Sequence, residues 1–148
     1  NREDMIVEAV AAIGFLKRHA ESTGKVGAVG FCFGGGVVNR MATDSTDLDA
    51  GVPYYGAQPP ADKVAAIKAP LLLQYAENDD NINKGIADFE TALKANNKKY
   101  TKHIYAGTQH AFNNDTGGAR YNKAAADLAW GRTLAFFSEN LGAPPKIG

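Results

Sequence analysis

The chain has 148 residues, which is enough for one domain with a hydrophobic core of its own. Sixteen basic and sixteen acidic residues give a formal net charge of zero, which argues against nucleic acid or an anionic membrane surface as a partner. The single cysteine excludes an internal disulfide and a multi-thiolate metal site, and no apolar run approaches the roughly 20 residues that span a bilayer.

Predicted helices and strands alternate along the chain. They are, in order, a helix over residues 6–16 that Gly24 ends, a strand over 26–31, a helix over 35–42, a strand over 50–55, a short helix over 62–67, a strand over 71–75, a helix with Ile86, Phe89 and Leu93 on one face, a strand over 100–105, and a final helix with Trp130, Leu134, Phe137 and Leu141 along one stripe. This alternation is typical of a mostly parallel α/β sheet with helices on both faces, in which ligands bind at the carboxyl ends of the strands. No repeat or interdomain linker divides the sequence, so we expect a single domain over residues 1–148.

The turn after the strand over 26–31 has the pattern of a nucleophile elbow. An apolar strand leads directly into Gly30-Phe31-Cys32-Phe33-Gly34, and a predicted helix follows. We expect Gly30 and Gly34 to let strand and helix approach closely, with Cys32 in a strained backbone at the apex. The helix N-terminus favours an anion, so the pattern also predicts a pKa for Cys32 below that of a free thiol. Together these features point to a hydrolase with a thiol nucleophile.

Two other interpretations of this turn stay open from the motif alone. A lone cysteine after a buried strand is most often a small core residue. Glycine-rich turns between a strand and a helix also bind phosphates, as in a doubly wound nucleotide-binding domain. However, Cys32 stands where Gly-x-Gly-x-x-Gly has its second glycine, and no Gly-Lys-Ser/Thr ending follows. The choice therefore depends on partner residues elsewhere in the chain.

Two later loops carry residues that could serve a cysteine nucleophile. Asp79 and Asp80 follow the strand over 71–75, and His110 follows the strand over 100–105. The carboxyl ends of parallel strands meet at one edge of the sheet, so nucleophile, acid and histidine would arrive together in the order expected of α/β-hydrolases. We predict that His110 takes the proton of Cys32 and that Asp79, which is nearer to its strand than Asp80, holds the histidine ring.

Two smaller sets of residues complete the predicted site. The backbone N–H of Phe33, directly after the nucleophile, is a candidate donor to the oxyanion, whose second donor normally comes from a loop after an earlier strand. Tyr54, Tyr55 and Phe112 could line an apolar substrate pocket, although ordinary core packing would explain all three equally well. The residues therefore predict the chemistry more closely than the substrate.

Several motifs together resemble the dienelactone hydrolase family. They are Gly30-Phe31-Cys32-Phe33-Gly34-Gly35, Tyr54-Tyr55-Gly56, Glu77-Asn78-Asp79, Gly107-x-x-His110-Ala-Phe and the closing run from Ala129 to Phe137. The resemblance covers nearly the whole chain and implies an α/β-hydrolase fold with Cys32, Asp79 and His110 as the catalytic triad. It also implies hydrolysis of a small-molecule carboxylic ester or lactone through a thioester acyl-enzyme, with neither a metal nor an organic cofactor.

Two departures from the family pattern shape the expectations. Family members are longer, and the resemblance implies that early strands, the second oxyanion donor and an acidic residue that assists the cysteine lie outside residues 1–148. We therefore expect an N-terminally incomplete domain. Dienelactone hydrolases also place an arginine shortly after the catalytic histidine to hold the substrate carboxylate, whereas Asn113 and Asn114 follow Phe112 here and Arg120 lies farther along. As the substrate, we therefore expect a neutral ester or a different lactone at least as much as dienelactone itself.

An incomplete sheet also predicts a partner chain. Without the early strands, the apolar strand over 26–31 would lie at an open edge, and such an edge pairs readily with another chain. We therefore expect a second polypeptide or a symmetry copy to cover it.

Two further points stay open from the sequence. We place the protein in the cytoplasm, but export is an alternative, since the sequence starts at Asn1 and a targeting segment could have been lost. A catalytically inactive α/β-hydrolase fragment that serves as an interaction module is the alternative to an enzyme.

Overall fold

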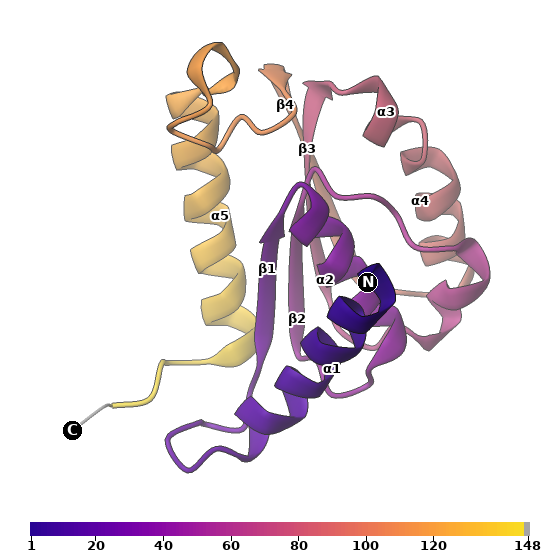
Figure 1. Ribbon diagram of the computed structural model, residues 1–148, viewed down its shortest axis with the longest axis vertical. Coiled ribbons are helices and arrows are strands. Elements are labelled where there is room, and N and C mark those ends of the chain that lie inside the picture. Colours follow the sequence, from indigo (N-terminus) through magenta and orange to yellow (C-terminus); the bar gives the residue numbers. More distant parts are fainter. Residues whose placement is uncertain (147–148) are drawn as a thin grey trace.

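Four parallel strands form one sheet in the computed structural model, which describes residues 1–146 (Figure 1). The strands lie side by side in chain order and are β1 (Gly27–Phe31), β2 (Ala50–Tyr54), β3 (Leu71–Asn78) and β4 (Tyr100–Gln109). The helices are α1 (Arg2–Arg18), α2 (Phe33–Asp44), α3 (Asp80–Asn83), α4 (Ile86–Ala95) and α5 (Lys123–Leu141), with short 3₁₀ helices over Ala61–Ala66 and Gly118–Arg120. The predicted α/β class and the alternation of elements are confirmed.

Helices cover both faces of the sheet, as the sequence predicts. On one face, α1, α2 and α4 contribute Ile13, Val38 and Leu93 to a buried cluster with side chains of the strands. On the other face, α5 packs Ala125 and Ala129 against a second cluster (Figure 1). All of β2 and the first six residues of β3 are buried, because these interior strands have a helical layer on each side.

A buried polar network joins α5 to the sheet. The side-chain amide of Gln74, on β3, donates to the carbonyl of Ala129 at 2.9 Å and to the hydroxyl of Thr133 at 3.1 Å. The hydroxyls of Tyr54 and Thr133 lie 2.7 Å apart, and the hydroxyl of Tyr105 donates to the side-chain oxygen of Gln74. Because these buried groups satisfy one another, they fix the helix in one position on the sheet at little desolvation cost.

The predicted apolar stripe of α5 is wrong in part. Trp130 and Leu134 are 42% and 53% exposed, whereas Ala125, Ala129 and Thr133 face the sheet. Small residues let the helix approach closely enough for Thr133 to reach the polar network, which places the larger side chains at the margin. The hydrophobic pattern alone does not show this.

Strands β3 and β4 both extend beyond their predicted ends. Their backbones stay paired as far as Asn78 and Gln109, although the residues after Tyr75 and Tyr105 are mostly polar or small. Main-chain hydrogen bonds do not depend on side-chain hydropathy, so the apolar run understates the strand. As a result, Asp79 and His110 each follow their strand directly.

Strand β1 lies at an edge of the described sheet. Its only strand neighbour is β2, and Val29 and Phe31 are 37% and 38% exposed. These two side chains are therefore partly exposed to solvent. The same strand is covered by α5 at Gly27, where an added Cβ would lie 2.7 Å from the ring of Phe137.

Candidate active site

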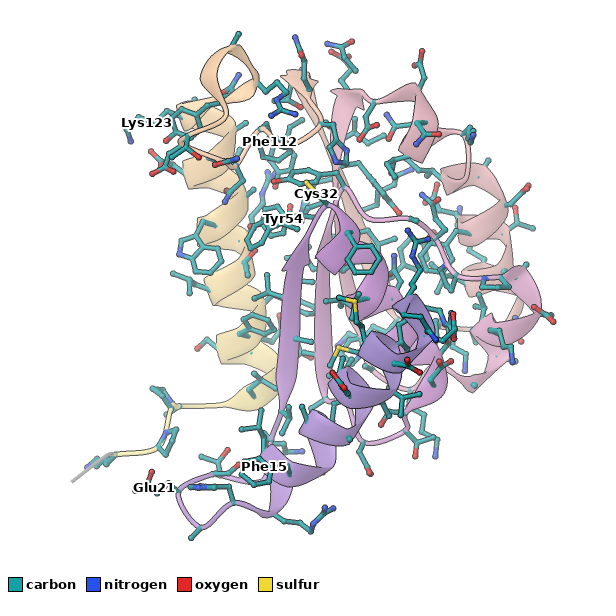
Figure 2. The ribbon with its side chains drawn as sticks, viewed as in Figure 1. Phe15, Glu21, Cys32, Tyr54, Phe112 and Lys123 are labelled. Carbon is teal, nitrogen blue, oxygen red and sulfur yellow. The ribbon has the colours of Figure 1, made fainter. Side chains whose placement is uncertain are left out.

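Cys32 occupies the sharp turn between β1 and α2, at the carboxyl end of the sheet (Figure 2). Its φ of 54° and ψ of −119° are a strained conformation for a residue with a side chain, as the elbow pattern predicts. A Cβ atom on Gly30 would lie 2.2 Å from the carbonyl oxygen of Gly34, so the turn can close only over a glycine. The expectation for Gly34 is wrong, because a Cβ there would meet no atom within 4 Å.

The second close approach involves Gly35 and the end of β2. A Cβ atom on Gly35 would lie 2.5 Å from the carbonyl oxygen of Tyr54, and one on Gly56 would lie 2.2 Å from the carbonyl carbon of Gly35. Tyr55, between these contacts, also has a positive φ of 35°. The turns after β1 and β2 are therefore in backbone contact and hold each other in place.

Asp79 and His110 meet beside this turn. An oxygen of the Asp79 carboxylate lies 2.6 Å from Nδ1 of His110, and Asp79 is buried. Asp80, the other candidate, is exposed as the first residue of α3. Because Nδ1 of His110 is engaged by the carboxylate, Nε2 is the ring nitrogen left for a substrate or a nucleophile. The structure therefore brings together the two residues that the sequence pairs.

A bulge in β4 sets the histidine opposite the acid. Ala76 pairs with Tyr105, but two residues later Asn78 pairs with Gln109, so β4 contains two more residues than β3 over this interval. Without the extra residues, Asp79 would lie opposite position 108 instead of position 110.

Gly107 and Glu77 hold this bulge. Gly107 has a φ of 71°, which favours glycine, and its N–H donates to the carboxylate of Glu77 at 2.7 Å. The hydroxyl of Thr108 donates to the carbonyl of Tyr105 and stabilises the same turn. These contacts explain why Glu77 and Gly107 belong to the motifs around the acid and the histidine.

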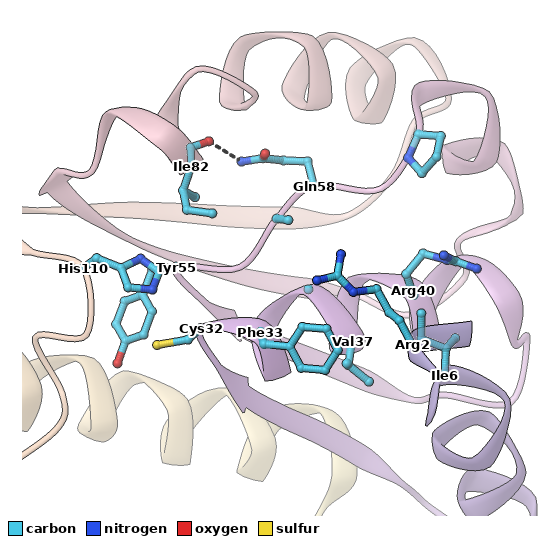
Figure 3. Close-up of a pocket in the computed structure, with 13 residues that line it drawn as sticks. Arg2, Ile6, Cys32, Phe33, Val37, Arg40, Tyr55, Gln58, Ile82 and His110 are labelled. Atoms are coloured by element: carbon cyan, nitrogen blue, oxygen red, sulfur yellow. Dashed lines mark hydrogen bonds between the residues drawn. The ribbon is translucent and has the colours of Figure 1, made fainter. Parts of the chain in front are cut away.

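Cys32 and His110 line the same cleft, which has a volume of about 390 Å³ (Figure 3). In the part of the chain that the structure describes, no hydrogen bond joins the two side chains. Burial raises the pKa of the Cys32 thiol, while the charge of Arg120 lowers it and that of Asp79 raises it. The predicted lowering of the Cys32 pKa is therefore wrong for this conformation, because desolvation outweighs the favourable charge.

The remaining predicted residues divide between the cleft and the core. Phe33 follows Cys32 directly and is the first residue of α2, so its N–H has no carbonyl within that helix to bind. Tyr55 lines the cleft, and its ring centroid lies 5.0 Å from that of His110. Cys32 borders this cleft and also a second hollow of about 300 Å³. Tyr54 and Phe112 are fully buried in the core cluster and line neither of them, so ordinary packing accounts for both residues.

Other elements contribute cleft residues that the sequence does not single out. They are Arg2 and Ile6 from α1, Val37 and Arg40 from α2, Gln58 from the loop after β2, and Ile82 from α3. The side-chain amide of Gln58 donates to the carbonyl of Ile82 at 3.1 Å and closes one wall (Figure 3). Gln58 and Ile82 carry a signal in the sequence, since each lies four residues after the carboxyl end of a strand.

Residues 1–146 contain neither a cluster of metal-ligating side chains nor a membrane-spanning helix. No three His, Cys, Asp or Glu side chains gather there as a metal site would require. No helix over these residues is long and apolar enough to cross a membrane.

The fold and the site define the class of protein. A parallel sheet whose first strand turns at a strained cysteine, with an acid and a histidine after later strands in that order, is an α/β-hydrolase fold. A family model described as the dienelactone hydrolase family matches residues 1–141. The chain belongs to this family.

Known relatives agree with this assignment. A "Putative carboxymethylenebutenolidase" of Saccharolobus solfataricus is 37% identical over 135 residues, which cover 90% of this chain and 51% of that protein. A "Probable 2-oxo-3-(5-oxofuran-2-ylidene)propanoate lactonase" of Bradyrhizobium is 31% identical over 144 residues, covering 88% of this chain and 57% of that protein. A solved structure of a "Putative Dienelactone Hydrolase" from Klebsiella pneumoniae has a TM-score of 0.82 at 26% identity and covers 93% of this chain and 62% of that one. The chain thus spans between 51% and 62% of the length of these proteins.

Proposed function

We propose that this chain carries the catalytic residues of a carboxylic ester or lactone hydrolase that works through a thioester. The observation that carries the proposal is the 2.6 Å contact between Asp79 and His110 in the wall of a cleft that Cys32 also lines. Membership of the dienelactone hydrolase family and the lactonase named among the relatives support the same reaction class.

In the first step, Sγ of Cys32 attacks the carbonyl carbon of the substrate and its proton passes to Nε2 of His110. The carbon–sulfur bond forms as the carbonyl oxygen takes the negative charge, and the N–H of Phe33, the first of α2, donates a hydrogen bond to this oxygen. His110 then donates the proton to the leaving oxygen as the carbon–oxygen bond breaks, and a thioester on Cys32 remains. Asp79 holds the ring in the required tautomer and stabilises its charged form.

In the second step, a water molecule replaces the leaving group. His110 takes a proton from this water, whose oxygen attacks the thioester carbon, and the carbon–sulfur bond breaks as the acid is released. The sulfur recovers its proton from His110, so all groups return to their starting state. The absence of a hydrogen bond between the Cys32 and His110 side chains in residues 1–146 is compatible with this reaction, because catalytic hydrogen bonds in empty sites often form only in the substrate complex.

A burst experiment with 4-nitrophenyl butyrate tests the proposed function. We expect rapid release of 4-nitrophenol, with a butyryl group found on Cys32 by mass spectrometry and removed by hydroxylamine. Cys32→Ala should abolish both signals, and His110→Ala should slow the burst by about 10²- to 10⁴-fold. His103→Ala is the matched control, because His103 lies on the same strand, β4, and does not line the cleft. A folded protein that never acylates Cys32 would instead favour the inactive interaction module.

A further inference from the structure

Asp79 occupies a position at which an acidic side chain ordinarily caps a helix. It is the N-cap residue of α3, and an aspartate at such a position commonly accepts a hydrogen bond from a backbone N–H of the first turn. In this structure the Asp79 side chain makes no capping bond to α3. One of its carboxylate oxygens lies 2.6 Å from Nδ1 of His110 instead. The carboxylate therefore has two competing positions, and only one of them serves the histidine.

Helix α3 is too short to hold its own shape without a cap. It consists of the four residues Asp80–Asn83, and the N–H of Asn83 closes its turn by donating to the carbonyl of Asp79 at 2.8 Å. A single turn is unstable in water, because ordering its residues costs more free energy than its few hydrogen bonds return. Contacts from outside the helix must therefore supply the stabilisation that a cap would give.

The side chain of Asn83 makes such contacts. Its amide group donates to the carbonyl of Ala76 at 2.7 Å and to the carbonyl of Glu77 at 3.1 Å. Both carbonyls belong to the end of β3, in the interval where the register between β3 and β4 shifts. The amide thus ties the end of α3 back to the strand before it and closes residues 76–83 into a loop that contains Asp79.

A second amide holds the same turn from the side of the cleft. Gln58 donates to the carbonyl of Ile82, and a Cβ atom on Gly85 would lie 2.2 Å from Oε1 of Gln58, so the two segments fit closely (Figure 3). Gln58 lines the cleft, so its replacement would change the cleft as well as the turn. Asn83 lines neither hollow beside Cys32, which makes it the residue whose effect can be isolated.

We propose that Asn83 is a positioning residue for the hydrolase reaction. Its amide stabilises α3 in place of a cap and so leaves the carboxylate of Asp79 available to His110. This inference rests on the proposed function and adds to it a residue outside the cleft. Without the amide, α3 gains more from a capping bond, and the carboxylate is drawn towards the N–H groups of the helix and away from the histidine.

The hydrogen bond between Asp79 and His110 can be followed by NMR in protein that carries isotope-labelled histidine. A proton on Nδ1 held by a carboxylate at this distance resonates far downfield, and its loss in His110→Ala assigns it. Asn83→Ala, and the isosteric Asn83→Asp, which has no donor when ionised, should both weaken this resonance or abolish it. Asn83→Gln keeps the amide and should retain part of it. Asn96→Ala is the matched control, because the Asn96 amide donates to a carbonyl at the end of α4, that of Ala92, at 2.8 Å.

A double-mutant cycle shows whether Asn83 acts through Asp79. We expect Asn83→Ala to slow the acylation of Cys32 by 4-nitrophenyl butyrate about tenfold, the effect of losing one or two neutral hydrogen bonds. In the Asp79→Ala protein the same replacement should have no further effect, because the carboxylate that it would misplace is gone. Asn96→Ala should leave the rate unchanged in both backgrounds.

The two measurements separate this inference from the proposed function. A downfield resonance that survives in both Asn83→Ala and Asn83→Asp would overturn the role of Asn83, and so would an equal slowing with and without Asp79. Circular dichroism establishes that each variant is folded, and if Asn83→Ala is not, the contrast between Asn83→Asp and Asn83→Gln decides. Failure of the wild-type protein to acylate Cys32 would overturn the proposed function, while the resonance would still report whether Asn83 positions Asp79.

Discussion

Cys32 combines a partly buried position at the apex of a turn with an environment that favours its neutral form. The strained backbone of such a residue typically costs about 1–3 kcal/mol and presents the sulfur at the end of the sheet. Partial burial and the nearby charge of Asp79 raise the pKa of the thiol, and Arg120 offsets only part of this effect. The thiol is therefore held in its protonated form, and in the proposed reaction His110 would have to remove its proton.

This environment predicts the pH dependence of alkylation. With the pKa raised in the folded protein, the thiolate forms only at higher pH, so the iodoacetamide rate should reach its midpoint above about 8.5, the value of a free thiol. The same chain unfolded in urea is the control, and its single cysteine should show the ordinary midpoint. If the pH midpoint of alkylation is lower in the folded protein than in the unfolded chain, the pKa of Cys32 is lowered on folding, as the elbow pattern predicts.

At the scale of elements, the site depends on the register between β3 and β4. The bulge at Gly107 adds two residues to β4 and so sets His110 opposite Asp79. Gly107 is free of steric contact, since a Cβ there would meet nothing within 4 Å, so only its positive φ requires glycine. Disturbing this one backbone conformation should affect the pairing of acid and histidine.

Gly107→Ala tests this dependence against a matched variant. Gly142, at the end of α5, has a φ of 75° and equally open surroundings, but it lies far along the chain from the site. Both alanine variants should lose unfolding free energy through backbone strain, about 1–2 kcal/mol for Gly107→Ala and about 1–3 kcal/mol for Gly142→Ala, whose ψ of −165° lies in a region essentially restricted to glycine. Only Gly107→Ala should also lower kcat for a test ester, which burst kinetics beside urea denaturation would show. Equal activity in the two variants would mean that the bulge does not position His110.

The sequence predicts the helices and strands, and the grouping of Cys32, Asp79 and His110, better than it predicts where the strands end. The elbow, the acid and the histidine follow from local patterns, because each stands after a predicted strand. The ends of β3 and β4 do not, since main-chain pairing continues through Asn78 and Gln109 without an apolar signal. The contribution of Arg2 to the cleft is also invisible locally, because it depends on how α1 packs against α2 in the folded chain.

At the scale of the whole molecule, the two edges of the sheet differ. Strand β1 exposes Val29 and Phe31, whereas β4 carries charged and polar residues such as Lys102 and His103. Charged side chains on an edge strand oppose pairing with another chain, and apolar ones favour it. The partner that the sequence predicts would therefore lie along β1.

We expect the 148-residue chain to associate through β1 in solution. Val29→Lys should shift it towards monomers in analytical ultracentrifugation, because a buried lysine would oppose the contact. Ile104→Lys is the control, since Ile104 is also exposed, at 48%, but lies on β4. A chain that is monomeric at all concentrations, with β1 amides that exchange rapidly, would contradict this expectation.

The backbone contacts around the elbow distinguish positions that do not tolerate substitution from positions that do. Gly30, Gly35 and Gly56 belong to an inner wall of main-chain atoms, where an added Cβ would lie 2.2, 2.5 and 2.2 Å from a backbone atom, so these positions admit almost no substitution. The rim, with Arg2 on α1 and Ile82 on α3, consists of side chains whose replacement leaves that wall untouched. Substitutions at the rim can therefore change the side chains that line the cleft at small cost in stability. Substitutions in the inner wall would instead displace the turn that carries Cys32.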